Sequence, residues 1–147
     1  MIELLKLKYF YIILLSFISL VVVTSNKISA DQKIYIIADE IIVEQSEKKV
    51  RATGNAVAKD EKGTKIKSDE IIYDENQSLI NARGNVILND VEGNTYFFEE
   101  LVSDDEFKNL NGKDIGARLD DGSRIVGSKL IKKNNISGLN DAEYTPC

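Results

Sequence analysis

Residues 38–67 read ADEIIVEQSEKKVRATGNAVAKDEKGTKIK, and residues 68–97 read SDEIIYDENQSLINARGNVILNDVEGNTYF. The two stretches align without a gap and share nine identical residues in thirty, including an Asp-Glu-Ile-Ile start and a central Gly-Asn pair. A degenerate third copy restarts at Glu99, and its Asp-Gly-Ser stretch at 121–123 falls near the position of the earlier turn glycines. A repeat of this length indicates one supersecondary unit stacked on copies of itself.

Each of the first two copies contains a stretch in which apolar or small residues alternate with the rest. Residues 50–59 place small or apolar side chains at every even position, and residues 80–89 do the same. Strict alternation over ten residues predicts a strand with one buried face. Turn signals follow at residues 60–63 and 90–93, so each unit is expected to hold two strands and two turns.

The alternation changes phase between Ala38 and Ile41, and again in the second copy. A β-bulge or a strong twist near Asp39 and near Asp69 would restore the pattern. No stretch after the first thirty residues shows helical periodicity, apart from one short turn at 104–109. We therefore predict an all-β domain built from a thirty-residue repeat, in which antiparallel strands fold into two facing sheets as a β-jelly roll or an open antiparallel sandwich.

The side chains predicted to face the interior are small for a protein core. The residues expected to line that interior are Val50, Ala52, Ala56, Ala58, Ile66, Ile80, Ala82, Val86 and Leu88. Two interpretations stay open, because small side chains allow close packing of the two sheets and also leave room for an apolar ligand between them.

The first thirty residues have the pattern of an export signal. Lys6 and Lys8 precede fifteen largely apolar residues at 9–23, and Ala30 precedes Asp31. A basic start, an apolar centre and a small residue at the end are typical of a secretory signal. We predict a signal peptide over 1–30 and a folded domain over 31–147 outside the cytoplasm. An uncleaved anchor is the alternative, although a membrane-spanning helix needs roughly 20 apolar residues.

Charge and composition argue against nucleic-acid binding and against catalysis. Residues 31–147 hold 16 basic and 23 acidic side chains, whereas nucleic acids bind to basic faces. The chain has no histidine and only one cysteine, Cys147, so the commonest base and metal ligand is missing. The acidic pairs at 39–40 and 69–70 recur at the repeat period, which favours a structural role over calcium binding or hydrolysis. We predict no catalytic residue, no metal site, no cofactor and no enzymatic activity.

The repeated pattern Asp-Glu-Ile-Ile, Ala-x-Gly-Asn, Asp-x-x-Gly resembles the OstA-like domain of the lipopolysaccharide-transport proteins LptA and LptD. The resemblance covers residues 31–147. The stretch at 119–124 and the Tyr-Thr-Pro-Cys ending at 144–147 look like the end of the N-terminal periplasmic domain of the LptD family. The resemblance implies a twisted β-jelly roll, open along one side, whose apolar groove carries lipid acyl chains. It also implies that the chain is the N-terminal part of a longer protein with an outer-membrane barrel.

The function implied by the resemblance is transport and assembly of lipopolysaccharide in the periplasm, in association with the outer membrane. The implied partners are lipopolysaccharide, other OstA-like domains joined edge to edge, and an outer-membrane assembly partner, with no nucleic acid among them. The alternatives are a free-standing LptA-type bridge protein, an anchored LptC-type subunit and a structural β-repeat module that binds no lipid. Cys147 is unpaired within the chain, so we expect an intermolecular or downstream disulfide.

Overall fold

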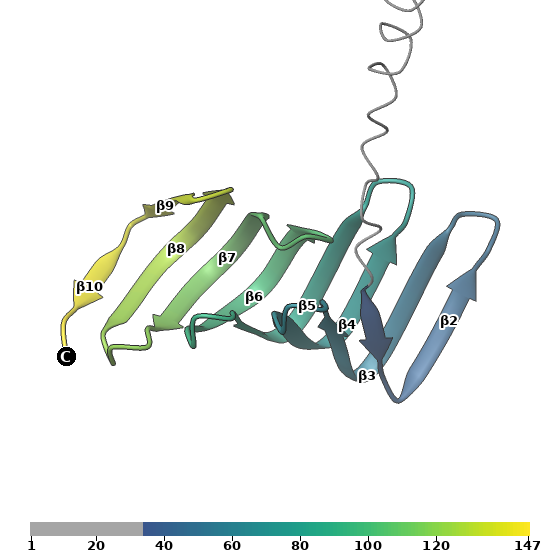
Figure 1. Ribbon diagram of the computed structural model, residues 1–147, viewed down its shortest axis with the longest axis horizontal. Coiled ribbons are helices and arrows are strands. Elements are labelled where there is room, and N and C mark those ends of the chain that lie inside the picture. The colour runs from purple at the N-terminus through teal and green to yellow at the C-terminus, as the bar shows by residue number, and fades with distance from the viewer. Residues whose placement is uncertain (1–33) are drawn as a thin grey trace, which may run out of the picture. The chain divides into compact units, whose positions relative to one another are not determined.

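The computed structural model describes residues 34–147, which consist of strands and turns (Figure 1). The strands are β1 (Tyr35–Ile37), β2 (Glu40–Glu44), β3 (Lys49–Lys59), β4 (Lys65–Asp74), β5 (Leu79–Asn89), β6 (Thr95–Asp104), β7 (Asn109–Arg118), β8 (Arg124–Lys133), β9 (Ile136–Asn140) and β10 (Glu143–Thr145). The predicted all-β fold is confirmed. The predicted signal peptide over 1–30 lies outside the described residues. Within residues 34–147, no helix is long and apolar enough to cross a membrane.

All ten strands belong to one antiparallel sheet, in the order β1-β3-β4-β5-β6-β7-β8-β10. β2 also pairs with β3, along its N-terminal half, while β1 pairs with its C-terminal end. At the opposite edge, β9 and β10 share β8 in the same way. Each edge of the sheet is therefore formed by two short strands with a break between them.

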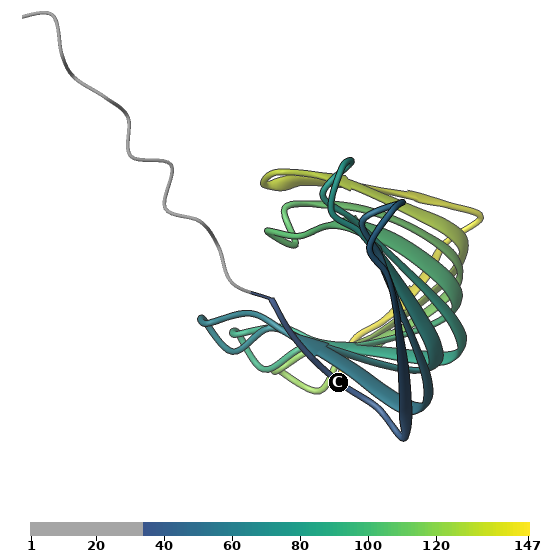
Figure 2. The ribbon, with the colours of Figure 1, turned by 90° about the vertical axis from the view of Figure 1, so that its right-hand side faces the viewer.

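The long strands bend near their middle, so the sheet folds over into two facing layers (Figure 2). We call the layer with β1 and β10 the lower layer, and the layer with β2 and β9 the upper layer, as Figure 2 shows them. The two layers expected as separate sheets are thus the two halves of one continuous sheet. The core lies between them, and its apolar side chains come from both halves of each central strand.

The bend is built from a short motif that we call the corner. In β3 the corner is Gly54-Asn55, and both residues have left-handed φ angles, 74° and 46°. The register between β3 and β4 shifts at this point, so β3 carries the extra residue of a β-bulge. The bulge was expected near Asp39 and lies on β3, the strand that faces Asp39. The Nδ2 of Asn55 donates to the Oδ2 of Asp39 at 2.9 Å. Residues 84–85 form the same corner in β5, where Asn85 donates to Asp69 at 2.9 Å.

The third copy of the repeat is present in the fold although its sequence has diverged. Gly122 has a left-handed φ of 85°, as Gly63 and Gly93 do in the first two copies. The backbone hydrogen bond from Leu119 to Ser123 measures 2.9 Å and closes the same kind of turn. The third copy therefore keeps the backbone geometry of the turn, although most of its residues differ from those of the first two copies.

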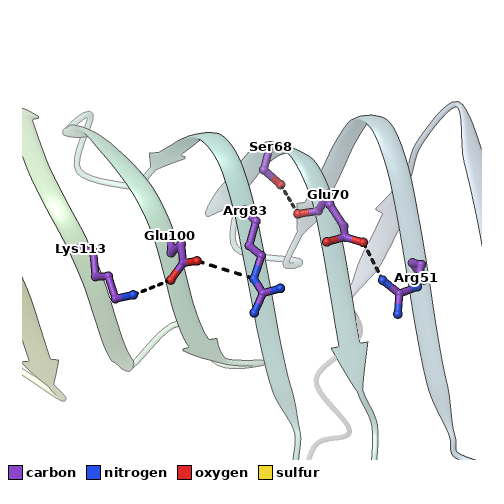
Figure 3. A network of polar contacts seen from close by, with 6 residues as sticks. All are labelled: Arg51, Ser68, Glu70, Arg83, Glu100 and Lys113. Carbon is purple, nitrogen blue, oxygen red and sulfur yellow. Dashed lines mark hydrogen bonds and ion pairs between the residues drawn. The ribbon is translucent and has the colours of Figure 1, made fainter.

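The outer face of the upper layer carries a line of ion pairs across neighbouring strands (Figure 3). Arg51 pairs with Glu70 at 2.6 Å, and Glu100 pairs with Lys113 at 2.8 Å and with Arg83 at 3.9 Å. The hydrogen bond and charge of Lys113 hold the pKa of the Glu100 carboxyl below its usual range. The pairs of Glu100 are exposed and each contributes little to stability, while the Arg51–Glu70 pair is part-buried; together they offset the charge of this face.

Gly84→Ala tests the corner. A Cβ atom at Gly84 would collide with the Oδ2 of Asp69, and the φ of 73° is unfavourable for any residue with a side chain. We expect the free energy of unfolding to fall by about 2 kcal/mol or more, measured by urea denaturation. Gly138→Ala is the matched control, because the nearest atom lies 3.8 Å away and φ is ordinary; its effect should stay within about 0.5 kcal/mol. Equal effects of the two changes would contradict a structural role for the corner.

Candidate functional site

A groove of about 460 Å³ lies between the two layers, at the end of the sheet formed by its later strands. Its lining residues come mainly from β7, β8 and β9 and from the turns that flank them. They are Thr64, Leu88, Asp90, Val91, Glu92, Tyr96, Phe107, Leu110, Ile115, Ala117, Leu119, Ile125, Leu130, Lys132, Asn134, Asn135, Ser137 and Leu139. The groove is thus formed largely by the part of the chain whose repeat is degenerate.

The walls of the groove are apolar and are supplied by both layers. Ile115 and Ile125 belong to the lower-layer halves of β7 and β8, while Leu110 and Leu130 belong to the upper-layer halves of the same strands. Leu110, Ile115 and Leu130 are buried, and Leu139 on the edge strand β9 is half-buried. A space with such walls favours a hydrocarbon chain.

Over the earlier part of the sheet, the inner side chains are buried in one apolar cluster. Ala52, Ile71 and Ala82 occupy one cross-strand row, and none of them is more than 1 % exposed. The row continues to Leu101 and then to Gly112, where the ring of Phe98 fills the place of a side chain. The interior is therefore packed over the first repeats and opens toward β9.

Phe107 enters the groove from the turn that joins β6 to β7. It is 6 % exposed and has a left-handed φ of 54°, a conformation that is costly for an aromatic residue. The left-handed residues in the other turns on this side of the sheet are Lys48, Ser78 and Asn134, and all three are exposed. Packing of the Phe107 ring against the apolar walls offsets this backbone strain, so the ring is held in the groove.

The opening of the groove is polar. Lys132, Asn134, Asn135 and Ser137 lie on the upper-layer side, and Asp90 is among the polar residues of the lower-layer turns. Apolar walls with polar groups at the opening suit an amphiphile whose chain is buried and whose headgroup remains in water.

Tyr96 and Asp90 join the lower wall to the opening. The Tyr96 hydroxyl donates to the Oδ2 of Asp90 at 3.2 Å, and the Oδ1 of Asp90 accepts the backbone N–H groups of Glu92 and Asn94. Burial, together with the charge of Asp90, raises the pKa of Tyr96 to about 12. The phenol therefore stays protonated at neutral pH and remains a donor to Asp90. Its ring stacks on Phe98 at a centroid distance of 6.5 Å, which links the groove to the packed interior.

Titration of the tyrosines tests this arrangement. We expect one tyrosine to ionise near pH 12, later than a free phenol at about 10,, with absorbance at 295 nm as the measurement. Between these two pH values the unfolded chain loses the phenol proton and the folded chain keeps it. The stability of the fold therefore falls as pH rises from about 10 to 12. Tyr96→Phe should remove the late-titrating group, and its persistence in that variant would contradict the assignment.

The nine residues predicted to line a groove are divided by the structure. Leu88 lines the groove. Ala52, Ala56, Ala58, Ile66, Ile80, Ala82 and Val86 are all buried in the packed interior, and Val50 is half-buried. Lipid contact by these eight residues stays a prediction.

Sequence reasoning missed the groove residues of the third copy, Phe107, Leu110, Ile115, Leu130 and Leu139. A signal was present, because Leu110 and Gly112 alternate with polar residues and Ile115 and Ala117 do so after a change of phase. Asp114, at the change, has a left-handed φ of 52°. The change of phase at Asp114 breaks the alternation of β7, as the changes near Asp39 and Asp69 do in the first two copies.

Cys147 is an exposed free thiol close to Gly122, and its disulfide stays a prediction. Among residues 34–147, no cluster of three acidic, histidine or cysteine side chains is arranged to hold a metal ion.

Comparisons with known proteins give a structural likeness and no sequence match. No protein-family model and no curated protein matches the chain. Among solved structures, the fold is similar to the crystal structure of LptH from Pseudomonas aeruginosa, with a TM-score of 0.67 and 12% sequence identity. The match covers 79% of this chain and 96% of that one. LptH is described as the LptA-homologous periplasmic component of the lipopolysaccharide transport device. At this identity the likeness shows the fold, an open β-jelly roll.

Proposed function

We propose that the domain carries acyl chains of lipopolysaccharide through the periplasm and that it acts by binding, without catalysis. The observation that carries the proposal is the groove between the layers, which has apolar walls and a polar opening. The likeness of the fold to LptH supports it. The small net charge and the absence of histidine in the sequence agree with a role that needs no acid–base chemistry.

The physical purpose of such a groove is to keep hydrocarbon out of water. Each methylene group withdrawn from water contributes roughly 0.8 kcal/mol, so an unshielded acyl chain does not cross an aqueous space readily. Leu110, Ile115 and Leu130 would cover the chain, while the sugar and phosphate groups stay at the opening. The ammonium group of Lys132 there is suited to phosphate,.

Export by the signal at 1–30 would place the domain in the periplasm. Within the OstA-like family, we propose the N-terminal domain of LptD, associated with the outer membrane, on the basis of the ending at 144–147. The alternative is a free-standing LptA-type bridge protein. A reading frame that continues past Cys147 into alternating strands of about ten residues would favour LptD, and a stop codon there would favour the bridge protein.

The two edges of the sheet are proposed to join other OstA-like domains. Among residues 34–147, β2 pairs only with β3 and β9 only with β8, so one side of each of these backbones has no partner strand there. Ile42 and Val43 on β2 are 45 % and 58 % exposed, and Ile136 on β9 is 78 % exposed. Exposed apolar edge strands are normally a hazard, and pairing with a neighbouring domain would cover them.

Photo-crosslinking in cells tests lipid binding. A photoreactive residue in place of Leu139 should capture lipopolysaccharide, because this side chain lines the groove. The same residue in place of Ile131, which is 39 % exposed on the outer face of β8, should capture none. Capture is measured as a shift of the protein on a gel, probed with an antibody to the lipid.

The same experiment decides between lipid carriage and a structural module. A folded, exported protein with no adduct at Leu139, Leu110 or Leu130 would favour a β-repeat module that binds no lipid. Adducts at Ala82 as well as at Leu139 would show that the layers separate along their length and that the packed residues contact lipid too.

Ile42→Lys tests edge pairing. We expect the wild-type domain to self-associate with rising concentration in sedimentation velocity, and the variant to remain monomeric, because a lysine on an edge strand opposes strand addition. Ile131→Lys is the matched control, since Ile131 lies in the same outward row but on β8, which has partners on both sides. Loss of association in both variants, or in neither, would contradict pairing through the β2 edge.

A further inference from the structure

The outer face of the lower layer has a charge opposite to that of the rest of the domain. Its two outward cross-strand rows hold five cations, Lys59, Lys65, Lys67, Arg118 and Arg124, and a single acid, Glu143. The exposed acids Asp69, Glu99 and Asp114 lie beside these rows, at the bend. Residues 34–147 as a whole hold 15 basic and 22 acidic side chains. In the corresponding rows of the upper layer, six basic residues stand among six acidic ones. The cations are therefore concentrated on one face.

Within residues 34–147, these five cations have no ion pair, whereas four of the six cations on the other outer face do. Arg51, Arg83 and Lys113 of the upper layer all contact carboxylates (Figure 3). Within residues 34–147, none of the five lower-layer cations has a carboxylate oxygen within 4.0 Å, including those of the adjacent acidic turns. Their charge is available to an external anionic partner.

The outward row nearer the bend is mostly apolar, although it includes Lys67 and Glu143. Ile37, Phe97 and Val126 are 66 %, 46 % and 52 % exposed, and they lie in one cross-strand row. Gly116 stands between Phe97 and Val126. A shallow pocket of about 240 Å³ opens at this point, and Arg118 is among the residues that line it. Apolar side chains and cations are thus mixed on the same face.

We propose that the outer face of the lower layer docks onto an anionic lipid surface. The apolar row would enter the boundary between headgroups and acyl chains, and the five cations would lie at the level of the lipid phosphates. Long lysine and arginine side chains suit this position, because their methylene stems cover apolar surface while the charged ends reach outward.

An acidic protein partner would fit this face less well. Lysine is depleted at protein interfaces, yet three of the five cations are lysines. The five cations belong to β3, β4, β7 and β8, which have partners on both sides, so a peptide has no free backbone to pair with beside them as it has at a sheet edge. A fluid surface of phosphates and hydrocarbon needs neither fixed partners nor backbone hydrogen bonds.

Residues 31–147 are suitable for the test without the apolar segment at 9–23. Every strand in the structure pairs within residues 35–145, and residues 32–147 form one compact unit. Vesicle co-sedimentation is the measurement, with phosphatidylcholine vesicles that contain or lack phosphatidylglycerol. We expect binding only to the anionic vesicles, and release from them at high salt.

Paired variants identify the face. The double change Arg118→Gln and Arg124→Gln should lower the vesicle partition coefficient by at least about tenfold. The double change Arg83→Gln and Lys113→Gln removes the same charge from the upper layer and should leave the coefficient nearly unchanged. Phe97→Ser should weaken binding, whereas Val102→Ser, an exposed apolar residue on the opposite half of β6, should not. Circular dichroism confirms that each variant is folded.

Three outcomes would overturn the proposal: no binding of the folded wild type to anionic vesicles, equal losses in the two double variants, or loss only when groove residues such as Leu130 are changed. If the wild type bound an acidic protein but not anionic vesicles, the first of these outcomes would apply and the proposal would be wrong. The proposal does not depend on lipid carriage, because the five cations lie on the outer face and the groove on the inner face. Failure of one test therefore leaves the other standing.

Discussion

The bend in the middle of each long strand is the constraint on which the rest of the structure depends, and in the first two copies of the repeat it includes a hydrogen bond from an asparagine amide to an aspartate carboxylate on a neighbouring strand. Asn55 donates to Asp39 and Asn85 donates to Asp69, each next to a glycine with a left-handed backbone. At these points the strand turns from one layer into the other. A flat sheet would expose its apolar face to water, because residues 34–147 contain no second sheet or helix to cover that face. The two-layer core and the groove both follow from the bend.

The sequence predicted the parts of the fold that depend on local pattern. Alternation at 50–59 and 80–89 identified strands and their buried faces, and the change of phase near Asp39 indicated a bulge. It did not indicate that the bulge lies on the partner strand, because register is a relation between two strands and is absent from either one alone. For the same reason the two layers were expected as separate sheets, although each long strand from β3 to β8 contributes to both.

The candidate site was less accessible from the sequence. The repeat directed attention to its best-preserved copies, where inner side chains such as Ala52 and Ile71 are fully buried. The groove lies where the repeat has diverged, and its most unusual side chain, Phe107, has a backbone conformation that its residue type does not suggest. Charge was misleading in a similar way. The net charge of the chain is negative, yet one outer face of the sheet is basic. Alternate residues of a strand point to opposite faces, so charges can separate between the faces, and the net charge does not show this separation.

The breaks in the two edge strands limit what can be added to this sheet. β1 and β10 are three residues long, and β2 and β9 are five. A straight foreign strand can therefore follow either edge for no more than five residues before the edge turns away into the other layer. Amyloid growth requires long, flat templates that accept any extended segment. An edge bent in this way admits only a strand with the same bend at the same position, so the curvature that encloses the core also protects the protein from indiscriminate aggregation.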